Sequence, residues 1–303
     1  MPAITRAQAN RELVPGLKTV WDGVVNRYRD EWKPMFESNT SERAFEEEVA
    51  ISGFGTAPIK SEGASVEYDT AQEFYSTTYR HTTIALAFAI TQEAIEDNLY
   101  ADVGKRYTKA CAWSMQNTKE VMAASIFNNG FSASYTYGDG KRFFATDHPL
   151  VNGGTNSNRP ATYVDLSETA LENAVIQIGG WTDFRGLKIA IKPKQLIVPN
   201  DLFFAADKIL NTVLKVDSAD NTLNSINHTG AIPMGYHVNH YLTDTDAWFI
   251  TTDAPDGTKY FDRVPMSFDK DGDFDTGNLR WKARARFSFG LTNPLTAFGS
   301  EGI

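Results

Sequence analysis

One segment restricts the fold of this chain more than any other. Residues 51–82 are rich in polar side chains, poor in aliphatic ones, and broken by three glycines and one proline. Alternation around residues 65–68 and 74–79 predicts the two extended arms of a hairpin. A hairpin with so little apolar surface is marginally stable in water by itself. We therefore expect this segment to lie across another molecule.

The chain as a whole has the composition of a folded protein. Of its 303 residues, 42% are hydrophobic and 22% are charged, enough for one large or two medium domains. Its formal net charge is −9. Dedicated nucleic-acid-binding proteins usually carry a basic excess, because neutralising phosphates supplies most of their affinity. The charge therefore argues against DNA binding as the main task.

Cysteine content and hydropathy indicate the compartment. The single cysteine, Cys111, excludes an intrachain disulfide and a multi-cysteine zinc site. The N-terminus lacks the apolar stretch of a secretory signal, and no segment approaches the ~20 apolar residues that span a bilayer. These features predict folding in a reducing cytoplasm without a membrane.

An amphipathic helix is predicted near the N-terminus, within residues 14–36. Its apolar side chains recur at steps of three and four, the spacing of one helix face. They are Leu17, Trp21, Val24, Tyr28 and Trp32. A lone helix cannot bury such a stripe, so we expect this arm to dock on the body of the chain or on a neighbouring subunit.

A strand over residues 83–90 is predicted to lead into a long helix over residues 91–128. Thr91 can cap this helix, which is far longer than the average helix. Apolar residues follow at steps of four: Ile95, Leu99, Val103, Tyr107, Cys111 and Met115. A helix with one such stripe is expected to lie along a sheet.

The remainder reads as a loop region, a small mixed module and a set of C-terminal strands. A helix opens at Ser167, residues 189–191 and 195–198 form a strand pair or one interrupted strand before a second helix, and residues 248–251 form a buried strand. This order is typical of an α+β fold. We expect the C-terminal strands to pair with the strand before the long helix, so that one domain wraps around an inserted one.

Three local patterns, together with this order of elements, carry a resemblance to a known family. They are Phe143–Pro149 followed by Gly153 and Gly154, Ile191–Pro199 before a helix, and Arg284–Gly290 followed by Asn293 and Pro294. The chain resembles tailed-bacteriophage major capsid proteins of the Hong Kong 97-like fold, in particular the Mu-like major head subunit group. The similarity in element order covers nearly the whole chain.

The resemblance implies a division of the chain. It assigns 1–50 to an N-terminal arm, 51–82 to an extended β-hairpin loop, 83–165 to a peripheral domain with a spine helix at 91–128, 166–255 to an inserted axial domain, and 256–303 to return strands of the peripheral domain.

The resemblance also implies a structural role without catalysis. The chain would self-assemble into pentamers and hexamers of an icosahedral phage head around packaged DNA, and would end in the virion. Its partners would be itself, a separate scaffolding protein and a portal, with no cofactor and no membrane. Lys60 is the only lysine of the loop, but no catalyst or partner for a covalent cross-link can be identified.

Three groups of side chains are predicted to make inter-subunit contacts. They are Trp21, Tyr28 and Trp32 in the arm; Phe54, Lys60, Glu62, Tyr68 and Arg80 in the loop; and Arg280, Lys282, Arg284 and Arg286 near the C-terminus. The last group alternates with apolar residues, which places four charges on one face of a strand. Acidic surfaces of neighbouring subunits are the favoured partner of this face, and weak contact with packaged DNA is the alternative.

Two other functions stay open. Asp147 and His148 could form the acid–base pair of a hydrolase, although no nucleophile motif accompanies them. The turn Asp269–Asp275 could hold calcium in a virion decoration or carbohydrate-binding protein. Its glycine stands at the wrong position for an EF-hand loop, so we interpret it as a solvated turn and predict no metal site.

Overall fold

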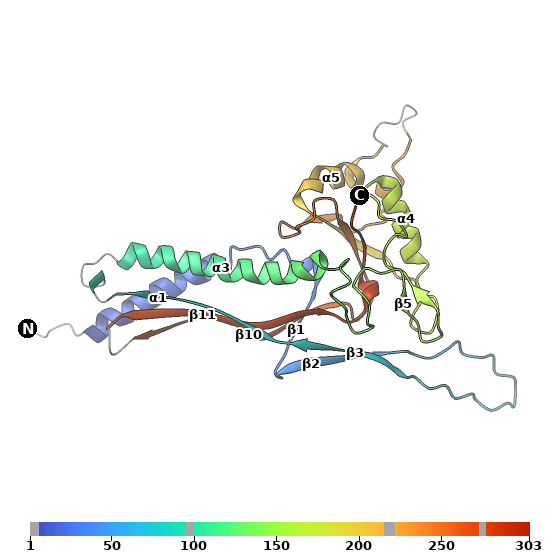
Figure 1. The fold of residues 1–303 in the computed structure, drawn as a ribbon, viewed down its shortest axis with the longest axis horizontal. Coiled ribbons are helices and arrows are strands. Elements are labelled where there is room, and N and C mark those ends of the chain that lie inside the picture. The colour runs from blue at the N-terminus through green and yellow to red at the C-terminus, as the bar shows by residue number, and fades with distance from the viewer. Residues whose placement is uncertain (1–5, 92, 95–99, 215–221, 273–276) are drawn as a thin grey trace, which may run out of the picture.

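The computed structural model describes residues 6–91, 93–94, 100–214, 222–272 and 277–303. Its helices are α1 (Arg6–Val25), α3 (Tyr100–Asn128), α4 (Glu168–Gly179), α5 (Phe203–Asn211) and α6 (Ser225–Thr229), with 3-10 turns η1 (Lys33–Met35), η2 (Asn200–Leu202) and η3 (Pro294–Thr296). Its strands are β1 (Glu37–Thr40), β2 (Phe45–Ile51), β3 (Glu73–Arg80), β4 (Thr82–Ile90), β5 (His148–Pro149), β6 (Thr155–Asn156), β7 (Pro193–Val198), β8 (Tyr236–Val238), β9 (Trp248–Thr252), β10 (Thr258–Gly272), β11 (Leu279–Leu291) and β12 (Ala297–Ser300). Figure 1 shows an elongated body, a second body that rises from one end of it, and a hairpin that extends away from both.

A four-stranded sheet in the order β1-β10-β11-β4 forms the elongated body. β1 runs parallel to β10, and the other pairs are antiparallel. β11 pairs with β4 from Leu279 opposite Ile90 to Phe287 opposite Thr82. The prediction that C-terminal strands return to the strand before the long helix is therefore confirmed.

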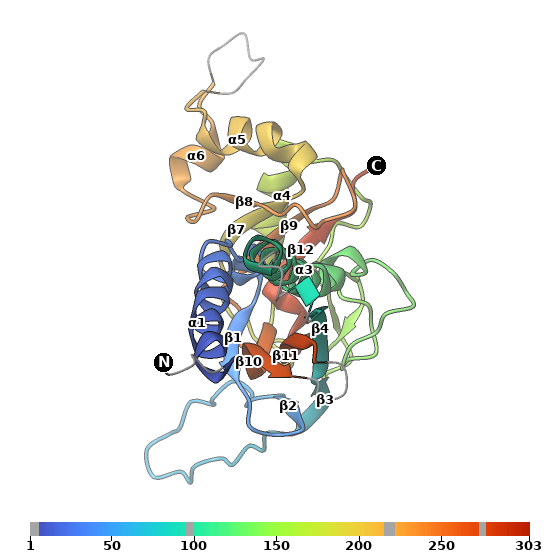
Figure 2. The ribbon, with the colours of Figure 1, turned by 90° about the vertical axis from the view of Figure 1, so that its left-hand side faces the viewer.

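Helices α1 and α3 cover one face of this sheet (Figure 2). The face is apolar because every second residue of β11 points toward α3, and two of these residues are the small Ala283 and Ala285, both buried. Trp21 of α1 stacks on Phe268 of β10 with ring centroids 4.7 Å apart. The arm helix thus docks on the body of its own chain.

The first helix is shorter at its C-terminal end than the sequence indicates. It ends at Val25, so Tyr28 and Trp32 follow it in a turn rather than continuing its stripe. The chain turns there because Trp32 packs on Tyr260, at 4.4 Å between ring centroids, and on Phe289. Tertiary packing of one indole overrides the helical spacing.

The long helix is present over its described part, α3, and residues 93 and 94 are also helical. Ile95 and Leu99 of the predicted stripe lie outside the described residues. Val103 and Tyr107 are exposed, whereas Gly104 and Thr108 are buried. Steps of four drift from the 3.6-residue period by about 40° each, so a stripe in steps of four turns away from the sheet.

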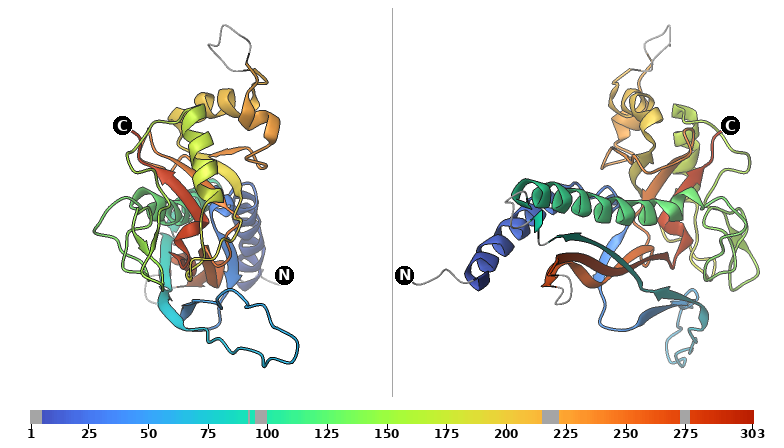
Figure 3. Two further views of the ribbon diagram at one scale, coloured as in Figure 1. Left: turned by 90° about the vertical axis from the view of Figure 1, so that its right-hand side faces the viewer. Right: turned by 60° about the vertical axis from the view of Figure 1, so that its left-hand side comes forward.

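A second four-stranded sheet, in the order β12-β9-β7-β8, forms the rising body (Figure 3). Its own core joins α4 to the sheet through Leu171, Ile178, Trp248 and Phe298. The Ser167 hydroxyl accepts a hydrogen bond from the backbone N–H of Ala170, which starts α4 as predicted.

Two predicted assignments in and around this sheet are wrong. Residues 256–303 do not all return to the first sheet, because β12 pairs with β9 and completes the second. Because β12 joins the second sheet, Phe298 is buried in the second core. Residues 189–191 form no strand, since Ala190 has a φ of 46° that is incompatible with extended pairing.

One arm of the extended hairpin is as predicted, since residues 74–79 lie within β3, but the other arm is a different strand than the sequence suggests. β2 pairs with β3 from Phe45 opposite Arg80 to Ile51 opposite Glu73, whereas residues 65–68 belong to no strand. The first arm of the hairpin therefore comes from the predicted N-terminal arm, residues 1–50. Residues 52–72, which we call the loop tip segment, connect the two strands.

Tyr79 fixes the hairpin on the first sheet. Its ring is buried against Phe261, with centroids 4.9 Å apart, and its hydroxyl pairs with the hydroxyl of Thr292. The ring also covers Gly290 of β11 so closely that an added Cβ would lie 2.5 Å from it. Only glycine at this position lets the hairpin approach.

We expect Gly290→Ala to destabilise the subunit by about 1–3 kcal/mol, because the buried Tyr79 ring cannot move away from the new methyl group. Gly272→Ala, at the end of β10 with nothing within 4 Å of its Cβ position, is the matched control and should change stability by less than about 0.5 kcal/mol. Urea unfolding of both variants measures the difference. Equal stability would show that the ring does not depend on this glycine.

Candidate assembly surfaces

The loop tip segment is exposed along its whole length apart from its base. The side chains of Ile59 and Tyr68 are 99% and 98% exposed, and Phe54 is also exposed. Lys60 and Glu62 lie between them, and Arg80 is exposed at the C-terminal end of β3. The hairpin thus brings all five predicted loop residues to solvent. Their contact with a neighbour remains a prediction.

One clamp ties the loop tip segment to its own chain. The Asp69 carboxylate accepts hydrogen bonds from the Gly55 N–H at 2.6 Å and from the Arg185 guanidinium at 2.8 Å. These donors lower the pKa of Asp69, the Gly55 N–H most of all. The clamp joins the base of the segment to the second body and leaves its apolar tip uncovered.

A cationic row occupies the outer face of the first sheet, opposite α3. Arg280, Lys282 and Arg284 are exposed and Arg286 is half-buried, while the residues between them are buried. The predicted alternation is therefore confirmed. Cross-strand neighbours on an antiparallel sheet share a face, so the row lies between carboxylates and serine of β10 and small side chains of β4. These neighbours are Asp271, Asp269 and Ser267 on one side, and Ala89, Ala87 and Ala85 on the other.

Two of the three predicted arm contacts are wrong. Trp21 and Trp32 are 3% and 2% exposed, because both are packed into the core of their own subunit. The Lys119 ammonium lies 4.4 Å from the centre of the Trp32 ring and 4.3 Å from that of Tyr260. These indoles therefore stabilise the fold and have almost no surface left for a neighbour.

Tyr28, the third arm residue, is half-buried at a junction of three segments. Its hydroxyl pairs with that of Tyr241, and its ring meets the edge of Trp113 at 5.3 Å between centroids. Trp113 itself is exposed on α3. Any surface that Tyr28 offers to a neighbour is shared with this tryptophan.

A polar network at the same junction was not predicted. The Glu31 N–H donates to the Glu120 carboxylate at 2.9 Å, and the Glu31 carbonyl lies 3.0 Å from Nε2 of His237. The Glu31 carboxylate accepts from the His240 backbone N–H at 2.8 Å and contacts its imidazole at 2.8 Å. One residue thus connects the arm, α3 and the second body. No sequence spacing could reveal it, because the partners lie far apart in the chain.

Burial changes the ionisation of this network. Glu120 is 1% exposed, and burial, opposed by the Glu31 N–H and reinforced by the charges of Asp30 and Glu31, raises its pKa to about 7. Burial also lowers the pKa of the adjacent Lys119 and of His237. Glu120 therefore changes its ionisation near neutral pH.

The hydrolase hypothesis fails on the position of its two residues. His148 is buried, with Nδ1 2.6 Å from an Asp139 carboxylate oxygen and Nε2 3.0 Å from Oδ1 of Asn158. Asp147 is exposed and pairs with Lys141. The two residues therefore bind different partners and do not form an acid–base pair. His148 instead holds the loop around β5 in place.

Only part of the predicted acidic turn lies within the described residues. Asp269 and Asp271 lie on β10, whereas Asp273 and Asp275 are outside the described residues. Across the residues that the structure describes, no group of three or more His, Cys, Asp or Glu side chains is arranged to hold a metal ion. None of the helices described is long and apolar enough to cross a membrane.

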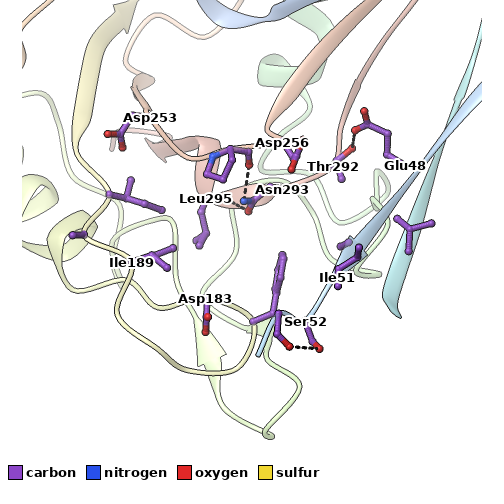
Figure 4. A pocket seen from close by; sticks show the side chains of 17 residues that line it. Glu48, Ile51, Ser52, Asp183, Ile189, Asp253, Asp256, Thr292, Asn293 and Leu295 are labelled. Atoms are coloured by element: carbon purple, nitrogen blue, oxygen red, sulfur yellow. Dashed lines mark hydrogen bonds between the residues drawn. The ribbon is translucent and has the colours of Figure 1, made fainter. Parts of the chain in front are cut away.

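A cavity of about 660 Å³ lies where the hairpin base meets the second body (Figure 4). It is bounded by residues 48–53 of β2 and its extension, by residues 183–191, by residues 253–256, and by the turn at 292–295. Its floor is apolar, with Ile189 and Leu295 pointing inward, and four carboxylates stand around it. We call it the hairpin-base cavity.

Solved structures that share this fold include a virus-like particle, a phage procapsid and a cyanophage capsid. The chain is 12% identical to that of a virus-like particle from Pyrococcus furiosus, with a TM-score of 0.52 and coverage of 94% of this chain and 98% of that one. The chain is 15% identical to that of the procapsid of bacteriophage JBD30, with a TM-score of 0.53 and coverage of 98% of this chain and 76% of that one. For the capsid of the cyanophage P-SCSP1u the identity is 10% and the TM-score is 0.55, with coverage of 88% of this chain and 85% of that one. At these identities the similarity shows the fold, and the predicted α+β capsid fold is confirmed.

The family is shown by sequence. Residues 74–298, most of the chain, match the model of the phage capsid protein family. The chain belongs to this family and is a structural subunit of a capsid shell. Comparison with curated protein sequences gives no match. The Mu-like group remains a prediction.

The junction network predicts a pH-dependent stability. A carboxyl whose pKa is raised on folding stabilises least when it is ionised, so the contribution of Glu120 to stability should fall as pH rises from about 5 through about 7. Glu120→Gln removes this ionisation, and we expect it to flatten the profile and to add about 2 kcal/mol at pH 8. Thermal unfolding between pH 5 and 8 measures both effects.

The matched control is Glu73→Gln, which removes an exposed carboxylate at the base of the hairpin. It should leave the shape of the pH profile unchanged. A Glu120→Gln profile that falls as steeply as that of the parent chain would mean that Glu120 is not the titrating group.

Proposed function

We propose that this chain is the major capsid protein of a tailed bacteriophage and assembles into the pentamers and hexamers of an icosahedral head around packaged DNA. The observation that carries the proposal is the loop tip segment, which exposes apolar side chains such as Ile59 and Tyr68 that belong to neither core of its own subunit. Large exposed apolar side chains on an extended segment are typical of a surface that another molecule covers.

The two bodies take different places in this proposal. The first sheet with α3 as spine helix is the peripheral domain, and residues 166–255 with β12 form the axial domain near the centre of each pentamer or hexamer. The hairpin of β2 and β3 reaches over the adjacent subunit. This arrangement is supported by the second core, which lies within the second body. The first core extends from the first sheet to Ile197, Phe249 and Ala297 of the second and so joins the two bodies.

Assembly by such hairpins is cooperative. Every subunit offers one loop tip segment and receives another, so each contact is reinforced by the ring that it closes. A modest area per contact is then sufficient for a stable shell. The subunit itself needs no cofactor and performs no catalysis, its partners besides itself are a separate scaffolding protein and a portal, and assembly in the host cytoplasm delivers it to the virion.

The cationic row of β11 fits an acidic neighbour better than DNA in this proposal. The chain carries a net charge of −9, so copies that approach one another repel unless local patches are complementary. Arg280, Lys282, Arg284 and Arg286 form such a patch on an otherwise acidic molecule. Contact with packaged DNA is the alternative.

Deleting residues 56–72 tests the role of the loop tip segment. Residues 52–55 would remain as a short connection between β2 and β3, of a length common in hairpins. We expect a folded subunit that forms no stable shells, because the covering segment is gone. Circular dichroism and unfolding check the fold, while sedimentation and electron microscopy check assembly. Normal shells from this variant would contradict the proposal.

The double variant Lys282→Gln with Arg284→Gln tests the cationic row. If the row pairs with a neighbour, shells should dissociate at lower ionic strength than those of the parent chain. The pair Lys188→Gln with Lys194→Gln removes equal charge at exposed positions elsewhere and should have no such effect. Unchanged shells that retain less DNA would favour the alternative.

A further inference from the structure

We propose that the hairpin-base cavity receives residues 58–60 of a second copy, with Ile59 on its apolar floor and the Lys60 ammonium among its carboxylates. This inference rests on the proposed function. It names the contact between subunits that the proposed function does not specify. It assigns one partner to each half of the interface: a specific part of the loop tip segment on one subunit and a specific cavity on the next.

The cavity has the shape and chemistry of a receiving site. Its volume of about 660 Å³ is in the range of cavities that bind small groups. Its lining includes the apolar side chains of Ile51, Phe184, Ile189 and Leu295. Apolar surface of this kind gains from exclusion of water only when a side chain fills it.

The charges around the cavity select a cationic occupant. Glu48, Asp183, Asp253 and Asp256 line it, and no lysine or arginine is among the residues that line it in the described structure. Lys259 contacts Glu48 at 2.6 Å and Asp256 at 2.9 Å from one side, which leaves the cavity net negative. An ammonium group that enters with an apolar side chain would lower the repulsion among these carboxylates.

The backbone around the cavity supports a dedicated site. Ala190 and Asp256 have φ angles of 46° and 54°, and they are the described non-glycine residues with left-handed backbone. Both line this cavity. Such conformations cost energy and persist where the surrounding structure holds them, often at functional sites.

Residues 58–60 have the complementary features. Ile59 is 99% exposed and is followed directly by the exposed Lys60, while Pro58 restricts the backbone before them. Since Ile59 touches almost nothing in its own subunit, its own cavity does not hold it. Figure 1 shows the segment extending away from the body that carries the cavity. A second copy is therefore the occupant.

Disulfide trapping between two copies tests the contact. One full-length chain carries Ile59→Cys, and a second carries Ile189→Cys or Ile51→Cys on the cavity wall. The native Cys111 is 3% exposed and gives little background. After co-assembly and mild oxidation, we expect a disulfide-linked dimer, because a disulfide forms only when the two Cα atoms are within about 7 Å. Ile176→Cys, on the exposed face of α4 and outside the cavity, is the control partner and should give no dimer.

A charge variant tests why this segment is selected. With Ile59→Cys in place, Lys60→Glu should lose most of the cross-linked dimer, whereas Lys60→Arg should retain it. Equal yields from the two variants would show that the carboxylates do not select the occupant and would overturn this assignment.

The outcomes separate this inference from the proposed function. Shells that form without a cross-link to either cavity wall would overturn the inference and leave the shell function intact. A single chain carrying Ile59→Cys and Ile189→Cys that closes the disulfide as a monomer would show that the cavity holds its own loop. If the unmodified chain forms no shells with its scaffolding protein present, the proposed function fails and the inference fails with it.

Discussion

The structure depends on the ladder that joins β11 to both β4 and β10. This ladder brings residues 82–90 next to residues 279–291 and so holds two segments that are far apart in the sequence in one sheet. Everything between them must leave the sheet and return, which explains why the second body is an insertion with its own core. The small Ala283 and Ala285 on the buried face of β11 let α3 lie close to the sheet. The opposite face, which bears the cationic row, stays exposed.

The subunit divides its aromatic residues between two tasks. Trp21, Trp32 and Tyr79 are packed into the subunit, where they dock the arm and the hairpin on the first sheet. Phe54 and Tyr68 remain on the loop tip segment, exposed to solvent. A shell subunit must be stable before assembly and must still keep apolar surface for its neighbours, and this division meets both requirements.

The network around Glu31 fixes how three parts of the subunit sit relative to one another. It joins the arm, α3 and the second body through one backbone amide, one carbonyl and one carboxylate. Buried polar networks of this kind hold one geometry well when satisfied and cost energy when a member ionises. The pKa of Glu120, raised to about 7 by burial, makes the stability of this junction responsive to pH.

Sequence reasoning and tertiary structure decided different parts of this protein. The α+β order, the helix at residues 100–128, the return of β11 to β4 and the alternating cationic row follow from periodicity and turn residues, which are local properties. Tertiary structure alone decided that Trp21 and Trp32 are core residues, because an exposed and a buried indole have the same spacing in a helix. It also decided that β12 joins the second sheet, that His148 pairs with Asp139, and that β2 is the first arm of the hairpin. These features depend on which surfaces meet in space, and residue spacing along the chain does not determine which surfaces meet.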